Sequence, residues 1–297
     1  MNIYEHFSSK DVVDSEIDIS CIGAFDGLHL GHVELIKSAF KYSKNFQIIT
    51  FDTLPKIFFN KKLKPILSNT LRNNILKSFN PSNIVYLEFS KVNKISSEEF
   101  LELLVKNLKT KKIIVGKDFK FGKDRSGDIQ TLINFFGEEN VIIFDDFFIE
   151  NEKLSSTKIR NYLDEGNIDK VNAFLGREYE IAGKVVKGMR LGSKIGFPTA
   201  NIKLEHEIYI PRLGVYEIEC YLNNDIYKGI VNIGYAPTIV DQKVLKVETH
   251  LFNFDQNIYG DDIKIRLQQF IRPEKKFLSI DDLLEQIKAD IDSIKNK

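Results

Sequence analysis

The pattern of predicted elements changes near the middle of the chain, and this change constrains the fold more than any other feature of the sequence. In the first half, short β-rich runs alternate with helical patterns, whereas in the second half strands follow one another without helices. Alternation predicts an α/β domain with a parallel, Rossmann-like sheet, and consecutive strands favour a small antiparallel β-barrel. With 297 residues and about 150 residues per domain, the chain is expected to form two domains, 1–177 and 178–297.

Hydrophobic periodicity and end signals assign elements to each half. The strands expected in the first domain are 17–24, 46–51, 84–89, 112–115 and 141–144. The expected helices are 32–42, 70–79 and 97–108, followed by a connector of two short helices, 157–165 and 168–175. The strands expected in the barrel are 179–186, 215–222, 227–233, 244–252 and 263–270. A terminal helix from Ser279 to Ile291 has apolar residues at helical spacing and is expected to pack on the barrel.

The charge balance excludes several classes of partner. Lysine and arginine number 42, as do aspartate and glutamate, so the net charge is zero and a general nucleic-acid or membrane-surface binder is not expected. The sequence shows no signal peptide and no apolar stretch near the roughly 18 residues that span a bilayer. Cys21 and Cys220 lie in apolar runs and suit buried thiols in a reducing compartment. We expect a cytoplasmic protein that binds small molecules, as a monomer or weak homo-oligomer.

The segment Cys-Ile-Gly-Ala-Phe-Asp-Gly-Leu-His-Leu-Gly-His, residues 21–32, passes from a strand into a helix. A helix start exposes N–H groups and the positive end of the helix dipole, so it binds phosphate, and glycines let the backbone come close. His29 and His32 would then hydrogen-bond phosphates and stabilise charge that develops on an α-phosphate and on leaving pyrophosphate. The alternative is a tight turn with two incidental surface histidines.

Two further segments carry polar groups suited to a nucleotide or a planar ring. Leu-Ser-Ser-Thr-Lys-Ile-Arg, residues 154–160, has hydroxyls at a helix start and ends in Arg160, although the same pattern also suits an ordinary helix cap. The loop 114–128 combines Asp118 with Phe119 and Phe121, which suits a ring held on its face and at its polar edge. The alternative for this loop is a connection whose phenylalanines anchor it in the core.

The second half has its own glycine-rich segment, 183–201, in which basic residues are interleaved with glycines. Such a segment wraps polyphosphate in backbone amides, and Thr199 and Asn201 offer neutral oxygens suited to Mg²⁺ or its waters. Glu248 lies in an alternating strand and suits a general base that deprotonates an alcohol. The alternatives are a long barrel loop and a solvated strand glutamate.

Taken together, these motifs resemble a known family. The His-x-Gly-His signature after Phe-Asp-Gly is similar to that of adenylyltransferases within the nucleotidyltransferase superfamily. Gly-Phe-Pro-Thr-Ala-Asn, Asn-Ile-Gly-x-x-Pro-Thr, Glu-x-His, Tyr-Gly and Ile-Arg-x-Glu-x-Lys-Phe are similar to the motifs of flavokinases. In this order they resemble the bacterial bifunctional riboflavin kinase/FAD synthetases over essentially the whole chain.

The resemblance implies two ATP- and Mg²⁺-dependent transfers. Riboflavin would become FMN in the barrel, with Glu248 as base and with Thr199 and Asn201 holding Mg²⁺ and ATP phosphates. FMN would then become FAD in the first domain, with pyrophosphate released and with His29, His32 and Arg160 as catalytic residues. The resemblance further implies ATP contacts at Gly23, Phe25, Asp26, Gly31, Ser156, Thr157, Gly188, Gly196, Pro198 and Thr199. It implies flavin contacts at Asp118, Phe119, Phe121 and Arg272.

One position departs from the family pattern. The family usually has Thr-Phe-x-Pro-His-Pro after the second strand, whereas this chain has Thr-Phe-Asp-Thr-Leu-Pro, so Leu54 replaces a histidine. Loss of one such contact to a transition state costs about 1.5–3 kcal/mol, or about ten- to a hundredfold in rate. Two alternatives therefore stand beside the main interpretation: a riboflavin kinase with weakened or lost adenylyltransferase activity, and a non-catalytic flavin-binding regulator.

Overall fold

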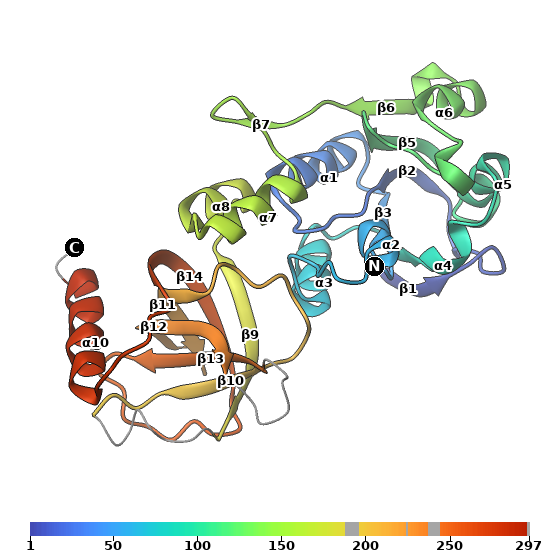
Figure 1. Cartoon of the computed structure of the whole chain (residues 1–297). Coiled ribbons are helices and arrows are strands. Elements are labelled where there is room, and N and C mark those ends of the chain that lie inside the picture. The colour runs from blue at the N-terminus through green and yellow to red at the C-terminus, as the bar shows by residue number, and fades with distance from the viewer. Residues whose placement is uncertain (188–195, 224, 237–243, 296–297) are drawn as a thin grey trace. The chain divides into compact units, whose positions relative to one another are not determined.

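Two units make up the chain, Met1–Ser156 and Thr157–Lys297, and each is described by itself (Figure 1). The computed structural model describes residues 1–187, 196–223, 225–236 and 244–295. The two short helices after Leu154 are α7 (Ser156–Glu165) and α8 (Ile168–Leu175). Asn172 fastens α8 within the second unit, because its side chain donates to the carbonyl of Leu267 at 2.9 Å and accepts from the N–H of Tyr179 at 2.8 Å.

The first unit contains a six-stranded sheet in the order β1-β4-β3-β2-β5-β6, and every neighbouring pair in it is parallel. Its strands are β1 (Asn2–Phe7), β2 (Ile17–Ile22), β3 (Phe46–Phe51), β4 (Asn83–Leu87), β5 (Thr110–Gly116) and β6 (Val141–Phe144). The expected parallel α/β sheet is confirmed. Strand β1 was not expected, because it is an edge strand with largely exposed side chains and has no apolar run.

Helices connect these strands. They are α1 (Leu30–Tyr42), α2 (Pro55–Phe59), α3 (Asn69–Ser78), α4 (Phe89–Val92), α5 (Ser97–Glu102) and α6 (Ile129–Phe136), with the short turns η1 (Leu103–Asn107), η2 (Lys123–Arg125) and η3 (Glu138–Asn140) and the hairpin strands β7 (Phe148–Ile149) and β8 (Glu152–Lys153). Ser96 and Glu99 form the capping box that starts α5. The expected helix 97–108 is therefore confirmed as α5 continued by the π-helical turn η1.

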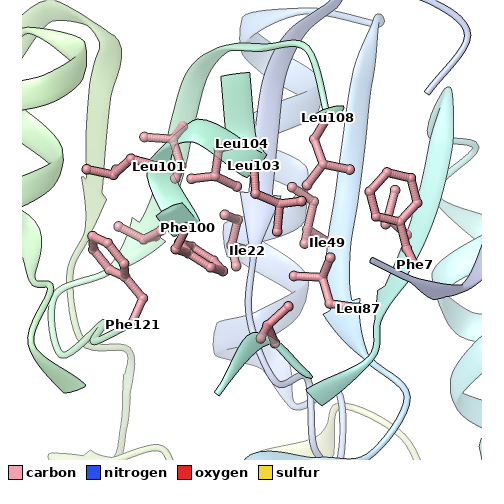
Figure 2. Close-up of a cluster of buried hydrophobic side chains, with 14 of the residues drawn as sticks. Phe7, Ile22, Ile49, Leu87, Phe100, Leu101, Leu103, Leu104, Leu108 and Phe121 are labelled. Carbon is pink, nitrogen blue, oxygen red and sulfur yellow. The ribbon is translucent and has the colours of Figure 1, made fainter. Parts of the chain in front are cut away.

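One face of the sheet packs against α5 and η1 (Figure 2). Ile22, Ile49 and Leu87 project from three adjacent strands, and Phe100 and Leu104 cover them from the helical side. These side chains are at most 2% exposed, so truncating one of them to alanine would cost about 2–5 kcal/mol. This core packs the helices against the sheet and so fixes the positions of the strands. In open α/β sheets, ligands bind at the carboxyl ends of the strands.

The second unit is a closed barrel in the order β10-β13-β12-β11-β14-β9, and β9 also pairs with β10. Its strands are β9 (Tyr179–Val186), β10 (Ala200–Leu204), β11 (Gly214–Leu222), β12 (Asp225–Ala236), β13 (Val244–Leu251) and β14 (Asp262–Pro273). The expected antiparallel barrel is confirmed. Strand β10 was not expected, since it is short and begins within the end of the glycine-rich segment.

The terminal helix is α10 (Ile280–Lys295), and Ser279 caps it by accepting from the N–H of Asp282 at 3.1 Å. Ile287 and Ile291 pack against Val215 and Ile230 of the barrel, which confirms the expected apolar face. None of the helices that the structure describes is long and apolar enough to cross a membrane. Both cysteines are buried thiols outside any disulfide, and burial raises the pKa of Cys220 to about 11.

Candidate active sites

The loop after β2 has an unusual backbone that its own side chains hold in place. Phe25 and Leu28 adopt φ values of 51° and 41°, and Gly27 adopts 82°. Left-handed conformations cost free energy for residues other than glycine, and the surrounding packing must supply it. The Phe25 and Leu28 side chains are fully buried and anchor the loop. A side chain at Gly23 would meet the Phe25 ring at 2.9 Å, so this position needs a glycine.

The loop delivers His29 and His32 to the start of α1. His29 is the N-cap, and its Nδ1 accepts from the N–H of His32 at 3.3 Å. In a neutral His29, the proton is therefore on Nε2, which is a donor. The two imidazoles are stacked with ring centres 3.6 Å apart, and the Phe25 ring meets the edge of His32 at 5.4 Å. The structure thus brings both predicted histidines together at a helix N-terminus, next to Gly31.

Asp26 fastens this loop to the rest of the first unit. Its carboxylate is buried and accepts from the N–H of Ile66 at 3.1 Å, and its carbonyl accepts from the hydroxyl of Ser156 at 2.7 Å. Ser156 is thereby placed beside the histidine loop. Thr157 and Arg160 follow on α7 in the second unit, where the buried Arg160 guanidinium lies 5.4 Å from the centre of the Tyr209 ring.

A charged cluster follows the neighbouring strand β5. Asp118 is exposed and pairs with Lys153 at 3.0 Å, and Lys153 also pairs with Asp146 at 2.8 Å. Asp146 contacts Lys117 as well, and hydrogen bonds from both lysines hold the pKa of this carboxyl below its ordinary value. The strand order changes direction between β2 and β5, which makes this pair of strands the topological switch point of the sheet. The charged cluster and the histidine loop both follow these strands, and doubly wound sheets bind ligands in the crevice at such a point.

The two phenylalanines of the loop after β5 differ in their surroundings. Phe121 is 6% exposed, and its ring packs 5.1 Å from Phe100 in the core (Figure 2). Phe119 is half-buried and stacks on Phe121 at 5.6 Å. A side chain at Gly127 would lie 2.5 Å from the Phe121 ring, so glycine is needed for this packing. Of the two rings, only that of Phe119 keeps appreciable exposed surface.

Leu54, which replaces the family histidine, is buried at the start of α2. Its carbonyl accepts from the N–H groups of Ile57 and Phe58, each at 2.9 Å, but its side chain caps nothing. The Leu54 backbone therefore starts α2 through its carbonyl, but the Leu54 side chain has no group that could hydrogen-bond a substrate.

In the barrel, a cavity of about 290 Å³ contains four of the residues predicted from the sequence, namely Thr199, Asn201, Glu248 and Arg272. The strand register explains the arrangement, because Glu248 of β13 pairs with Asn201 of β10 on one side and with Asn232 of β12 on the other. Three polar side chains thus stand side by side across three strands.

Sequence reasoning missed Asn232, Lys246 and His250 as lining residues of this cavity. The period of two in β13 was the available signal, since residues 246, 248 and 250 share one face. Lys246 Nζ lies 3.6 Å from Glu248 Oε1, and both side chains are about one-third exposed. His250 Nδ1 hydrogen-bonds the carbonyl of Pro198 at 2.9 Å and so fixes the segment that leads to Thr199.

Arg272, which lines the cavity, joins the barrel to α10. Its Nε lies 2.9 Å from each carboxylate oxygen of Asp290, and another guanidinium nitrogen lies 2.8 Å from Asp290 Oδ2. Asp290 is 3% exposed, so this is a buried, charge-assisted pair. Together with the apolar side chains of Phe277 and Ile287, the pair holds α10 as one wall of the cavity.

A second cavity of about 360 Å³ shares Thr199 with the first. Pro198 and Thr249 also line it, as does the segment 254–259. Gly196 precedes it with φ 86°, a conformation that favours glycine. The predicted contact Gly188 lies outside the described residues.

Comparisons with known proteins match both units. A family model described as FAD synthetase matches residues 13–158, and one described as riboflavin kinase matches residues 175–297. The chain is 38% identical to a bifunctional riboflavin kinase/FMN adenylyltransferase of Buchnera aphidicola subsp. Schizaphis graminum, over 92% of each chain. It is 31% identical to the protein of the same name from Bacillus subtilis, over 92% of this chain and 90% of that one.

A crystal structure described as a macrolide-efflux protein from Streptococcus pneumoniae has a TM-score of 0.90 and 31% sequence identity, covering 100% of this chain and 99% of that one. These matches define a two-module class of flavin-related transferases, with the adenylyl-transfer module before the kinase module. The chain belongs to the bifunctional riboflavin kinase/FMN adenylyltransferase family.

Proposed function

We propose that the barrel transfers the γ-phosphoryl group of ATP to riboflavin, and that the α/β sheet unit then transfers an adenylyl group from ATP to the resulting FMN. Family membership over 92% of the chain supports both steps, as does the order of the two matched models. We assign the first activity to residues 178–297 and the second to residues 1–177. The substrates are small molecules in the cytoplasm, and neither step calls for a nucleic acid or a membrane.

In the kinase step, the 290 Å³ cavity takes riboflavin and the 360 Å³ cavity takes ATP. The first cavity has an apolar wall from Phe277 and Ile287 for the flavin ring, with Arg272 near it and Glu248 at its polar side. The second cavity is lined by Pro198, which lies two residues after Gly196. Phosphates that the glycine-rich segment binds would therefore lie beside this cavity. Thr199 lines both cavities, so phosphoryl transfer takes place near this residue.

Glu248 serves as the general base in this step. Its carboxylate accepts the proton of the ribityl 5′-hydroxyl as that oxygen forms a bond to the γ-phosphorus, and the bond from the γ-phosphorus to ADP breaks. The oxygens of Thr199 and Asn201, beside the Glu248 carboxylate, are the hard donors that Mg²⁺ prefers, so the residues present fit this ion. When bound, Mg²⁺ neutralises phosphate charge. Lys246 adds a positive charge beside Glu248.

In the adenylyl transfer, a phosphate oxygen of FMN attacks the α-phosphorus of ATP, and the bond to pyrophosphate breaks. His29 and His32 donate hydrogen bonds to the phosphates at the start of α1, where the helix dipole also favours negative charge. Ser156 adds a hydroxyl beside the histidine loop. Thr157 and Arg160 of α7 are the further ATP contacts that the family's motif implies. The flavin ring lies near Asp118 and Phe119, and the ring of Phe121 stacks on that of Phe119.

The observation that carries the proposal is the placement of Glu248 between Asn201 and Asn232 in a cavity with an apolar wall. Two separate assays test it: consumption of riboflavin with Mg-ATP, and conversion of FMN and Mg-ATP to FAD and pyrophosphate. We expect the wild-type chain to carry out both. If riboflavin is not phosphorylated, the proposal is wrong for the barrel, and if FMN is not adenylylated, it is wrong for the sheet unit.

A further inference from the structure

The first unit contains a cavity to which no residue of the two proposed transfers has been assigned. It measures about 230 Å³ and is lined by polar side chains from β1, α3 and β4 and from the end of β3: Glu5, His6, Asp52, Asn69, Arg72, Asn73 and Tyr86. Neither histidine of the loop before α1 lines it, nor does any residue of the loop after β5. A cavity with polar walls suits a polar ligand, because water or a hydrogen-bonding group must satisfy its walls.

Arg72 is the central group of this cavity. It is 3% exposed, and one terminal guanidinium nitrogen donates to the carbonyl of Phe51 at 2.8 Å. Its guanidinium carbon lies 5.5 Å from the centre of the Tyr86 ring. Within the part of the chain that the structure describes, its buried Nε has no hydrogen-bond partner. A buried cation with an unused donor is costly unless an anion compensates it.

The carboxylates near Arg72 do not provide that compensation in full. One oxygen of Asp52 accepts from the N–H groups of Thr53 and Phe89, and the other faces His6 Nδ1 at 3.4 Å. Glu5 is exposed to water. Burial lowers the pKa of Arg72 even though Tyr86, Asp26 and Asp52 act in the opposite direction.

The remaining wall offers further donors. Asn73 accepts from the hydroxyl of Tyr86 through its Oδ1, so its amide nitrogen is left to donate. Asn69 is the first residue of α3, and the N-terminus of that ten-residue helix favours negative charge. His6 has φ 52° at an irregularity in the pairing of β1, which turns its side chain toward Asp52 at the cavity.

We propose that this cavity is a binding site for a phosphate-type oxyanion, separate from the nucleotide sites, in which Arg72 and the amides of Asn69 and Asn73 hold the anion. The volume admits a phosphate group with a small attached moiety, so the anion is either free phosphate or a phosphate monoester of a small sugar. The proposal does not depend on either transfer reaction.

Three variants on α3 test it, and two of them are a matched pair. Asn69→Asp adds a negative charge at the cavity, and an aspartate in the first turn of a helix stabilises that helix, so the variant is expected to fold. Asn74→Asp adds the same charge on an exposed position of α3 that does not line the cavity. Arg72→Gln removes the central cation, and circular dichroism checks its fold.

The measurement is calorimetric titration of inorganic phosphate into the full chain, with the nucleotide sites already filled by a non-hydrolysable ATP analogue. We expect one additional phosphate site in the wild type, at least tenfold weaker binding in Asn69→Asp, and binding within about twofold of wild type in Asn74→Asp. A parallel titration with ribose 5-phosphate distinguishes the two sources, since tighter binding of the ester identifies a phosphate monoester and equal binding identifies free phosphate. Absence of the site in the wild type, or equal binding in both aspartate variants, would overturn the proposal.

Discussion

At the scale of single residues, the two sites depend on different chemistry. In the barrel, one carboxylate stands between two amides, and a lysine lies 3.6 Å away. In the sheet unit, two stacked imidazoles stand at a helix N-terminus, with no carboxylate among the residues assigned to catalysis. A proton must leave the ribityl hydroxyl in the first reaction, whereas the phosphate of FMN is already ionised in the second. A base is therefore needed only in the barrel.

The role of Glu248 leads to a residue-level prediction. Glu248→Gln keeps the size and polarity of the side chain but removes the base, so kcat for riboflavin phosphorylation should fall by about 10²–10⁴. Adenylylation of FMN by the same variant should stay at the wild-type rate. Glu217→Gln, on barrel strand β11 and outside the cavity, is the matched control and should retain both activities. Kinase activity above half of the wild-type rate in Glu248→Gln would contradict the assignment.

Leu54 provides a second prediction at this scale. Leu54→His restores a hydrogen-bonding group at a position where the side chain now offers none, and FAD formation from FMN should rise by about tenfold, the lower end of the effect of one such contact. Leu54→Met retains an apolar side chain and should leave the rate unchanged. The readout is the initial rate of pyrophosphate release. An unchanged rate in Leu54→His would show that this contact is supplied elsewhere in the chain.

At the scale of elements, each site lies where a strand ends and another element begins. The loop after β2 passes into α1, the loop after β5 packs its phenylalanine into the core, and β10 carries Asn201 beside β13. The strands fix the point at which each loop begins, and the buried side chains of the loop itself fix its conformation. The packing of one such loop can therefore be tested by stability measurements alone.

Gly127 and Gly116 make a matched pair for that test. Gly127→Ala places a methyl group 2.5 Å from the Phe121 ring, and overpacking of this kind costs about 1–3 kcal/mol. At Gly116, no atom lies within 4 Å of an added Cβ, so Gly116→Ala should change the free energy of unfolding of the first unit by less than about 0.5 kcal/mol. Urea denaturation measures both values. Equal effects of the two substitutions would contradict the packing described for Phe121.

The start of α6 gives a prediction on pH. Asp128 caps this helix, and hydrogen bonds from Thr131 and Lys120 lower its pKa from 3.8 to about 2. A carboxyl whose pKa is lowered by folding contributes stability above its unfolded pKa, and that contribution disappears as the pH falls from about 4 to about 2. Asp128→Asn keeps a capping side chain but does not titrate.

The variant should therefore unfold more easily than the wild type at pH 7, and this difference should shrink at pH 2. Urea titrations of both proteins at the two pH values provide the measurement. A difference that is the same at both values would show that Asp128 does not contribute through its charge.

Much of the fold followed from the sequence, and the exceptions have physical reasons. Central strands are buried on both faces and are therefore apolar runs, which periodicity detects, whereas β1 lies at an edge and β10 is a short strand that begins within the end of a glycine-rich segment. Among the site residues, His29, Asn201 and Glu248 belong to motifs with distinctive spacing. Asn232 and Lys246 line the cavity because of the register in which β12 pairs with β13. A single sequence does not reveal that register.

At the scale of the whole molecule, the chain joins two transfers whose product and substrate are the same compound. The barrel makes FMN and the sheet unit consumes it, and each unit has its own candidate site. Zero net charge agrees with the proposed sites, in which helix ends, glycine-rich segments and single cations would bind the phosphates without a basic surface.

The most direct measurement of the central claim is a time course with riboflavin and Mg-ATP, in which FMN and FAD are separated by chromatography. The wild type should form FMN first and FAD after it. Glu248→Gln should form FMN and FAD from riboflavin at no more than about a hundredth of the wild-type rate and yet convert supplied FMN to FAD, whereas a variant with both His29 and His32 replaced by alanine should stop at FMN. Riboflavin that stays unphosphorylated in the wild type, or FAD formed from riboflavin by the Glu248→Gln variant at the wild-type rate, would contradict the account.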